Sequence, residues 1–391
     1  MNFKELADRT ESYIIDRRRY YHAHPELSNE EKETTNAIVK DLEEIGLEPV
    51  RFKNSFGCYA YVRGSKPGKT VALRADIDAL PIVEETGFEF ASQNHGCMHA
   101  CGHDSHIATL LGAAKMLYEV RDQLCGSVKL LFQPAEESGD GAKSVIAEGF
   151  LDDVDAIYGC HTWGKLDSPK IAIDSGAIMA SAAQFKATIE GVSAHGSAPH
   201  LGIDAAVAAS SVIMALQSYV SRNNDPLNPL VVTVGTVHGG SRWNVICNKI
   251  EFEGTVRTFS EKLIEEVPVV MRRIIENGAA AFGATGKLDF RWFVVPTVNS
   301  HEDLNELARN AAIKMYGEDA VGHLPPDMGG EDFSFYMQKV PGVFAFLGSR
   351  NVETGNTYTN HQEQYSCDES DLKRGSAVYA QFAFDYLEAN A

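Results

Sequence analysis

Residues 105–138 decide the fold class of this chain, and their sequence is SHIATLLGAAKMLYEVRDQLCGSVKLLFQPAEES. Apolar residues dominate HIATLLGAAKMLYEV and recur at helical spacing, which predicts a helix with a large buried face. SVKLLFQ, at 127–133, is a short apolar run that predicts a buried strand. A helix joined to a buried strand by a short connection is typical of a mostly parallel sheet covered by helices.

The same alternation of strands and helices continues on both sides of this segment. The strands that we expect outside it are 58–64, 69–75, 156–161 and 342–350, and the helices are 11–46, 140–149, 304–317 and 371–390. Between the first two strands, GSKPGKT has three residues between its glycines, where a phosphate-binding loop has four, and a strand follows it. We therefore interpret this segment as a hairpin turn.

The pattern changes near residue 180, where the order of elements becomes β-α-β-β-α-β. The strands are expected at 183–191, 230–237, 250–259 and 287–295, and the helices at 204–220 and 267–283. This order is the signature of a ferredoxin-like α+β unit. We predict an α/β fold in which a discontinuous α/β/α domain with a mostly parallel sheet, 1–178 and 296–391, carries the ferredoxin-like domain 179–295 as an insertion.

The composition is that of a soluble globular protein and excludes several classes of function. Of 391 residues, 44% are hydrophobic, and 54 Asp and Glu outnumber 35 Lys and Arg to give a net charge of -19. So acidic a surface repels phosphate backbones and anionic lipids, so we expect neither nucleic acid nor membrane as a partner. The amino terminus lacks the pattern of a signal peptide. The seven scattered cysteines do not form a disulfide framework, which predicts a reducing, cytoplasmic setting.

Polar side chains follow three of the expected strands. Asp76 and Asp78 follow 69–75, Glu136 and Glu137 follow 127–133, and His161 ends 156–161. Ligand sites in open α/β sheets form at the carboxyl ends of strands, so these groups are candidates for one site. Each group alone is more simply explained as a structural histidine or a solvated charge, but together they favour a metal site.

A fourth cluster, His99–His106, precedes the long helix and adds a cysteine, Cys101, to the candidate ligands. Adjacent carboxylates in a turn can reach the same cavity, so one of Glu136 and Glu137 could ligate a metal while the other serves as a general base. Two other interpretations of Cys101 stay open, namely an inert buried thiol and a nucleophile activated by a nearby histidine.

Six stretches together resemble the M20 metallopeptidase family, above all its amidohydrolase branch of N-acyl-amino-acid amidohydrolases, hippurate hydrolases and auxin-conjugate hydrolases. They are HGCMHACGHDSHIA, LRADIDALPI, FQPAEES, GVSAHGSAPHLGIDA, NVI followed by EGTVRTF, and GGEDFS. The resemblance covers nearly the whole chain, and the combination is specific although the single motifs are not.

The resemblance implies a binuclear centre that holds two divalent ions, Zn²⁺ or Mn²⁺, on five ligands: Cys101, His103, Glu137, His161 and His361. Cys101 stands where many relatives have a bridging aspartate. Glu136 matches the general base, and Asp78 matches an aspartate that orients a metal ligand. Asp76 stands where peptidase branches have a histidine ligand, and we do not count it among the ligands.

The inserted domain resembles the lid and dimerisation domain of the family, which implies a homodimer. His195 matches a histidine that polarises the scissile carbonyl and stabilises the oxyanion, often from the partner subunit. Asn244 and Arg257 are implied contacts for a substrate carboxylate, although Arg257 could equally form a structural ion pair. Glu331 in GGEDFS has a supporting role near the substrate.

The function implied is metal-dependent cleavage of the amide bond of a small N-acyl amino acid, with an acetyl, benzoyl or related acyl group, to a carboxylate and a free amino acid. A hydroxide bridging the metals attacks the carbonyl, and Glu136 carries the proton to the leaving amine. A dipeptidase or carboxypeptidase of the same family is the alternative. A non-catalytic binding protein is disfavoured because all five ligands and the base are present.

Overall fold

The computed structural model describes residues 2–391, and its internal contacts divide the chain into two compact units. The first unit extends to Gly176 and also contains Val298–Pro325 and Asp332–Ala391. The second unit consists of Ala177–Thr297 and Pro326–Glu331. Among the described residues, no helix combines the length and the apolar character that crossing a membrane requires.

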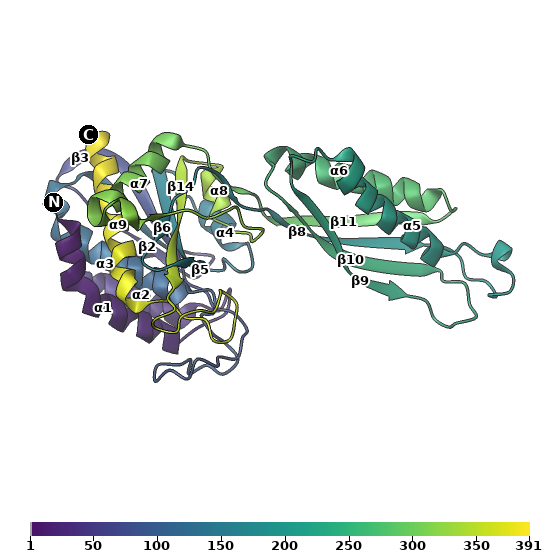
Figure 1. Cartoon of the computed structure of the whole chain (residues 1–391), viewed down its shortest axis with the longest axis horizontal. Coiled ribbons are helices and arrows are strands. Elements are labelled where there is room, and N and C mark those ends of the chain that lie inside the picture. The colour runs from purple at the N-terminus through teal and green to yellow at the C-terminus, as the bar shows by residue number, and fades with distance from the viewer. Residues whose placement is uncertain (1) are drawn as a thin grey trace. The chain divides into compact units, whose positions relative to one another are not determined.

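The first unit is built on an eight-stranded sheet in the order β1-β2-β4-β3-β5-β14-β6-β13 (Figure 1). The four central strands β4, β3, β5 and β14 run parallel to one another, while the β1–β2, β2–β4 and β14–β6 pairs are antiparallel. The strand bounds are β1 Val50–Arg51, β2 Cys58–Arg63, β3 Lys66–Asp76, β4 Cys125–Gln133, β5 Ala156–Asp167, β6 Ile171–Ala172, β13 Val321–Gly322 and β14 Gly342–Arg350. The mostly parallel α/β sheet is thus confirmed.

Seven helices belong to this unit, and most of them share one hydrophobic core with the sheet. Their bounds are α1 Phe3–Ala23, α2 Lys32–Ile45, α3 His103–Glu119, α4 Gly141–Ala147, α7 Glu302–Tyr316, α8 Ser334–Met337 and α9 Leu372–Ala389. Residues of α1, α2, α3, α7 and α9 pack with the strands in that core, whereas α4 and α8 contact β4 and β14 respectively. Leu110 and Leu111 of α3 are fully buried, as the apolar run predicts.

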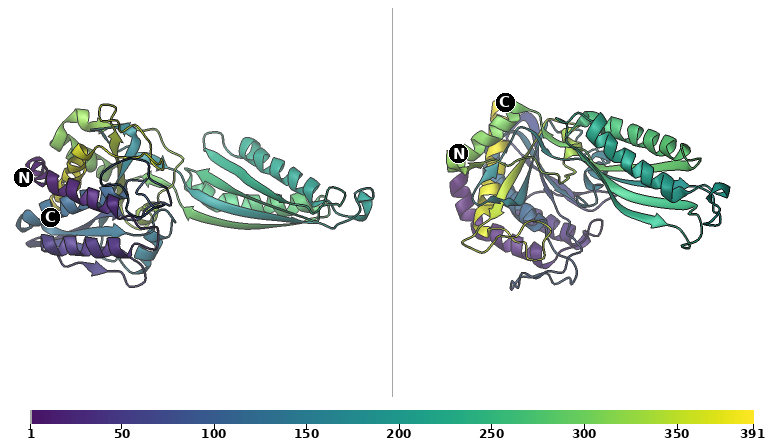
Figure 2. Two further views of the ribbon diagram at one scale, coloured as in Figure 1. Left: turned by 90° about the horizontal axis from the view of Figure 1, so that it is seen from below. Right: turned by 45° about the vertical axis from the view of Figure 1, so that its right-hand side comes forward.

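The second unit is an antiparallel sheet in the order β11-β8-β10-β9, with two helices packed on one of its faces (Figure 2). Its main elements are β8 Ala182–Glu190, α5 Ala205–Ser218, β9 Leu230–Gly239, β10 Lys249–Thr258, α6 Glu261–Ala280 and β11 Thr285–Val294. Along β8, Phe185 and Ile189 point into the core shared with the helices, and Lys186 points to solvent. Two short strands, β7 Gly176–Met179 and β12 Thr297–Asn299, pair where the chain enters and leaves this unit.

Two local predictions were wrong. The helix expected over 11–46 is interrupted, because α1 ends at Ala23 and α2 begins only at Lys32. Pro25 lies in the gap, and a proline lacks the N–H that a continuous helix would use while restricting the residue before it. The hairpin is also absent, since β4 lies between β2 and β3 and pairs with both.

The glycines that suggested a loop instead allow strands to approach closely. A Cβ atom on Gly64 would lie 2.3 Å from the carbonyl oxygen of Leu124 and 2.7 Å from that of Gly126. Backbone atoms cannot move aside as a flexible side chain can. The chain can therefore change direction after β2 only if residue 64 has no side chain.

We predict that Gly64→Ala destabilises the protein by about 1–3 kcal/mol, because the added methyl group must displace the β4 backbone. The matched control is Gly235→Ala in β9, where the nearest atom to the added Cβ is 3.9 Å away, and this variant should be neutral or slightly stabilised. Calorimetric unfolding of both variants measures the difference. Equal unfolding temperatures for the two would contradict the close-approach explanation.

Candidate metal centre

The carboxyl ends of β3 and β4 and the middle of β5 bring the predicted polar residues together, since β5 continues to Asp167 beyond the strand end predicted at His161. Asp76 at the end of β3 is in register with Gln133 at the end of β4, so the segments that carry Asp78 and the glutamate pair leave the sheet side by side. His161 lies on β5, the other neighbour of β3. Cys101 and His103 precede and begin α3, and His361 lies on the loop after β14.

The five predicted ligands form one cluster. The Cys101 Sγ atom lies 3.4 Å from His161 Nε2 and 3.3 Å from His361 Nε2. Glu137 Oε1 lies 3.5 Å from His361 Nε2 and 4.0 Å from His103 Nε2. Cys101, His103, Glu137 and His161 are buried or nearly so, while His361 is half-exposed. The cluster therefore opens to solvent on the side of His361.

The donor atoms fit a divalent metal because two of them are buried without a hydrogen bond. His103 Nε2 and Glu137 Oε1 are both inaccessible to solvent and accept or donate no hydrogen bond. The other ring nitrogens are held, since His103 Nδ1 donates to Asp78 Oδ1 at 3.1 Å and His161 Nδ1 donates to the Thr162 carbonyl at 2.7 Å. Metal-binding histidines are oriented by such bonds. Sulfur, imidazole and carboxylate donors together suit zinc-like ions.

The electrostatics of the cluster are also compatible with a bound cation. Burial, together with nearby Glu137 and Glu136, raises the pKa of the Cys101 thiol well above its usual value. Burial raises the pKa of Glu137 to about 7, although His103 opposes this shift. Burial disfavours the charged form of His103, but Asp76, Asp78 and Glu137 outweigh it and raise the pKa of this histidine to about 10. Metal ligands must be deprotonated, so a cation would displace protons from these groups.

The turn that carries the two glutamates is held by backbone hydrogen bonds. Ala135 has φ of 55°, a left-handed conformation that is rare outside glycine, and its N–H donates to Glu31 Oε1 at 2.7 Å. The N–H of Glu137 donates to Asp78 Oδ2 at 3.0 Å, and the N–H of Asp332 donates to Glu136 Oε1 at 3.3 Å. These bonds hold the backbone of Glu137 and the carboxylate of Glu136.

Asp76 is engaged by side chains of the protein. Its Oδ1 lies 2.5 Å from His106 Nδ1, and its Oδ2 accepts from Arg74 Nη1 at 2.7 Å and lies 3.6 Å from His103 Nε2. His106 Nε2 in turn accepts from the N–H of Thr162 at 2.8 Å. Asp76, His103, His106 and His161 are close enough to share an ion, but these bonds occupy both nitrogens of His106.

Sequence reasoning missed a residue that ties the ligand segments together. The Asn360 Nδ2 atom donates to the carbonyl of Cys101 at 2.9 Å and to that of Thr162 at 3.0 Å. Its side-chain oxygen accepts from the N–H of Gly164 at 3.0 Å. Asn360 precedes His361, which has φ of 70° and whose N–H donates to the Ala100 carbonyl. The only sequence signal for this role is the position beside a candidate ligand.

The second unit holds the predicted lid residues. His195 is exposed, and its Nδ1 accepts from the Ser197 N–H at 3.2 Å, which leaves Nε2 as the protonated nitrogen. The carbonyl of Asn244 accepts from the Gly196 N–H at 2.9 Å, while its buried side-chain oxygen has no partner. Arg257 lies on β10, where burial lowers its pKa, and its Nη1 donates to the Met328 carbonyl at 3.4 Å. Glu331 is buried at the end of Pro326–Glu331.

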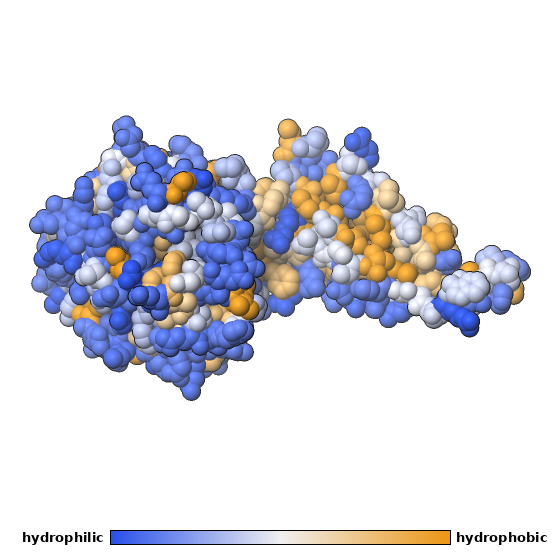
Figure 3. Space-filling model, turned by 60° about the horizontal axis from the view of Figure 1, so that its bottom comes forward, coloured by the Kyte–Doolittle hydropathy of each residue, from blue (hydrophilic) through white to orange (hydrophobic). Residues whose placement is uncertain are grey.

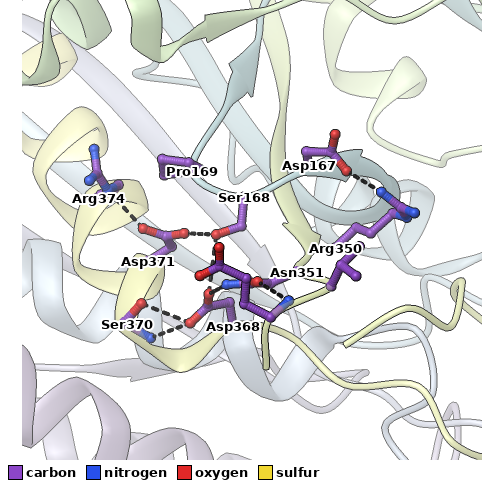
Figure 4. Close-up of a pocket in the computed structure, with 11 residues that line it drawn as sticks. Asp167, Ser168, Pro169, Arg350, Asn351, Asp368, Ser370, Asp371 and Arg374 are labelled. Atoms are coloured by element: carbon purple, nitrogen blue, oxygen red, sulfur yellow. Dashed lines mark hydrogen bonds and ion pairs between the residues drawn. The ribbon is translucent and has the colours of Figure 1, made fainter. Parts of the chain in front are cut away.

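A polar pocket of about 470 Å³ beside the start of α9 contains none of these residues (Figure 4). Its two central carboxylates are bonded within the protein. Asp368 accepts from Ser370 Oγ at 2.7 Å and from Asn351 Nδ2 at 2.5 Å. Asp371 accepts from Arg374 Nε at 2.7 Å and from Ser168 Oγ. These bonds link β5, η5 Glu369–Asp371 and α9. We therefore interpret the pocket as a structural junction between these elements.

A parallel-sheet fold with this buried cluster beside paired glutamates defines a metal-binding hydrolase. Comparison with known proteins names the family, since residues 72–385 match the model of peptidase family M20/M25/M40. The chain belongs to this family, which confirms the resemblance found in the sequence, and it is a hydrolase that acts on amide bonds.

Similar proteins cover nearly the full chain. It is 42% identical over 383 residues to the N-acetyl-L-cysteine deacetylase of Bacillus subtilis, with 97% of this chain and 89% of that protein covered. It is 38% identical over 383 residues to thermostable carboxypeptidase 1 of Saccharolobus solfataricus, with 96% of each covered. The solved structure of the Bacillus subtilis YXEP protein, a dinuclear metal binding peptidase of the M20 family, matches with a TM-score of 0.86 at 36% identity, over 97% and 99% of the two chains.

We predict that chelation lowers the unfolding temperature of the protein and that zinc or manganese restores it, because bound cations remove the cost of burying donor atoms without partners. In His361→Ala, added metal should restore less of the lowered unfolding temperature, because the variant lacks one of the five proposed metal ligands. His200→Ala, an exposed histidine, is the control. Thermal unfolding with and without metal measures the effect. An unfolding temperature indifferent to chelation would contradict the metal centre.

The burial of Glu31 predicts that the free energy of unfolding of the protein depends on pH. Burial, and secondarily the charge of Asp78, raises the pKa of this carboxyl from 4.5 to about 7. The folded protein therefore retains a proton that the unfolded chain releases, so the contribution of Glu31 to stability falls as the pH rises from about 4.5 to 7 and stays lost above that window.

We predict that Glu31→Gln removes this loss, on the order of 2–3 kcal/mol, while its amide oxygen still accepts from the Ala135 N–H. Relative to the wild type, the variant should gain stability between pH 5 and pH 8. Denaturant unfolding at both pH values measures the change. Parallel pH profiles for the two proteins would show that Glu31 ionises normally.

Proposed function

We propose that this chain is a metal-dependent amidohydrolase that cleaves the amide bond of N-acyl amino acids to a carboxylate and a free amino acid. The observation that carries the proposal is the pair Glu136 and Glu137. Glu137 faces the histidine ligands at 3.5 and 4.0 Å, while Glu136 is held separately by the Asp332 N–H. The similarity to an N-acetyl-L-cysteine deacetylase supports a substrate of this class.

The cluster of Cys101, His103, Glu137, His161 and His361 would hold two divalent ions, either Zn²⁺, which suits the thiolate, or Mn²⁺, which the family resemblance implies. When bound, such ions polarise an amide carbonyl and increase the acidity of water. The solved relative that is described as a dinuclear metal binding peptidase supports the count of two. Asp78 fixes the ring of His103 through its bond to Nδ1.

The chain supplies the proton transfer and part of the charge stabilisation. The carboxylate of Glu136 accepts the proton of the attacking water and delivers it to the leaving amine. His195, with its proton on Nε2, donates to the oxygen that becomes negatively charged, whether it acts on its own subunit or on the partner's. Asn244 and Arg257 bind the substrate carboxylate, which needs local donors in a protein with a net charge of -19. Glu331 supports this site.

The second unit is proposed to form a homodimer. Its edge strand β9 has a free side, and four large apolar residues on α5 and β9 are exposed: Val207, Met214, Val231 and Val237. The surface of this unit shows a concentration of hydrophobic side chains (Figure 3). Exposed edges and apolar patches of this kind favour association. The seven cysteines are free, which supports a cytoplasmic location.

A carboxypeptidase or dipeptidase is the second candidate, because the chain is also similar to a thermostable carboxypeptidase. Both reactions use the same cluster and the same base. They differ in the acyl part of the substrate, because a dipeptide carries a free amino group next to the scissile carbonyl and an acetyl or benzoyl group carries none.

We predict metal-dependent amine release from a panel of N-acyl amino acids and little from dipeptides. Two neighbouring variants separate the roles of the glutamates. Glu136→Gln should retain bound metal and lose kcat by about 10²–10⁴-fold, because it removes the base. Glu137→Gln should lose metal as well as activity. Amine release and metal content are measured on the same samples.

Three results would contradict this proposal. Activity that survives complete metal removal would point instead to Cys101 as a nucleophile. Full activity in Glu136→Gln would show that another group moves the proton. Release from dipeptides or peptides alone would assign the chain to the peptidase alternative.

A further inference from the structure

We propose that Asp332 is a positioning residue that holds the base Glu136 through a buried network with Arg74 and Gln133. This inference rests on the proposed function, in which Glu136 transfers the proton. Asp332 lies in the GGEDFS motif, but a role there was predicted from the sequence only for Glu331.

Asp332 contacts the proposed base directly. Its backbone N–H donates to Glu136 Oε1 at 3.3 Å. Asp332 is fully buried and Glu136 is 8% exposed, so water competes little for this bond. The position of the Asp332 backbone therefore helps to set the position of the carboxylate oxygen that receives the proton.

The side chain of Asp332 fixes that backbone position. Its Oδ1 accepts from Arg74 Nη2 at 2.9 Å, and its two oxygens lie 2.9 and 2.8 Å from Gln133 Nε2. Its Oδ2 also accepts from the N–H of Ala142 at 2.8 Å. Hydrogen bonds to an ionised carboxylate are the strong kind, and these have short, buried geometry.

The partners of Asp332 flank the segment that carries the base. Gln133 is the last residue of β4, and Ala142 lies in the first turn of α4. One carboxylate thus joins the two ends of the segment 133–142, and Glu136 lies between them. Loss of that carboxylate would release both ends at once.

Arg74 extends the network towards the metal ligands. It is 1% exposed, and it donates to Asp76 Oδ2 at 2.7 Å and to Gln133 Oε1 at 2.9 Å in addition to Asp332. Asp76 is itself bonded to His106. Buried ion pairs of this kind often add little net stability, so orientation of the site is the stronger explanation for a charged network here.

The test compares Asp332→Asn, which keeps the volume and one acceptor but removes the charge, with the wild type. We expect kcat to fall about 10–100-fold, as for other residues that orient a site, with KM and metal content within about twofold. The matched control is Asp41→Asn, a buried aspartate on α2 that pairs with Arg17 and Tyr21. It should lose stability without losing kcat.

A second readout does not depend on catalysis. Hydrogen–deuterium exchange of metal-stripped protein should show higher uptake in the segment 133–142 for Asp332→Asn than for the wild type or Asp41→Asn. If Asp332→Asn does not fold, Gln133→Met serves instead, because it removes two of the bonds to Asp332. It should lower kcat in the same direction by a smaller factor.

The proposal is overturned if the variant keeps wild-type kcat, if kcat falls only in proportion to lost metal, or if uptake in 133–142 is unchanged. Failure of the proposed function would give a different result, because the wild type would then release no amine from any N-acyl amino acid. The exchange result still decides the role of Asp332 in that case.

Discussion

Buried polar atoms that make no hydrogen bond within the protein constrain this structure most strongly. His103 Nε2 and Glu137 Oε1 face one another across 4.0 Å with no hydrogen bond to either, and the Cys101 thiol lies beside them. Such groups destabilise a fold unless something binds them. Divalent cations would bind these donor atoms, and the neighbouring carboxylates would supply negative charge to hold the cations. The strands, turns and loops around the cluster are arranged so that these donor atoms lie close together.

The surrounding carboxylates orient the site from outside the cluster. Asp78 bonds both His103 and the backbone of Glu137, Glu31 bonds the strained Ala135, and Asp332 bonds the segment around Glu136. Each of these acids is buried and acts on a different atom of the same region. The site is therefore preorganised by side chains that make no contact with a metal ion in the proposed mechanism, which limits the reorganisation needed during the reaction.

The sequence predicted candidate ligands on or after strands and the orienting role of Asp78, but not the contacts of Glu31 and Asn360. His161 and the glutamate pair follow apolar runs whose strand character is clear, and parallel strands deliver such residues to one edge. Glu31 bonds a residue 104 positions away, and Asn360 bonds one 259 positions away. No local pattern encodes pairings at that separation. The supposed hairpin failed for the same reason, because β4, which separates β2 from β3, comes much later in the chain.

Anomalous X-ray diffraction from crystals of the zinc-loaded protein would test the central claim most directly. The account predicts two anomalous peaks roughly 3.5–4 Å apart, both near the Cys101 Sγ atom. His103 and Glu137 should contact one ion, and His161 and His361 the other. A single peak, or ions bound by Asp76 and His106 in place of Cys101 and Glu137, would contradict it.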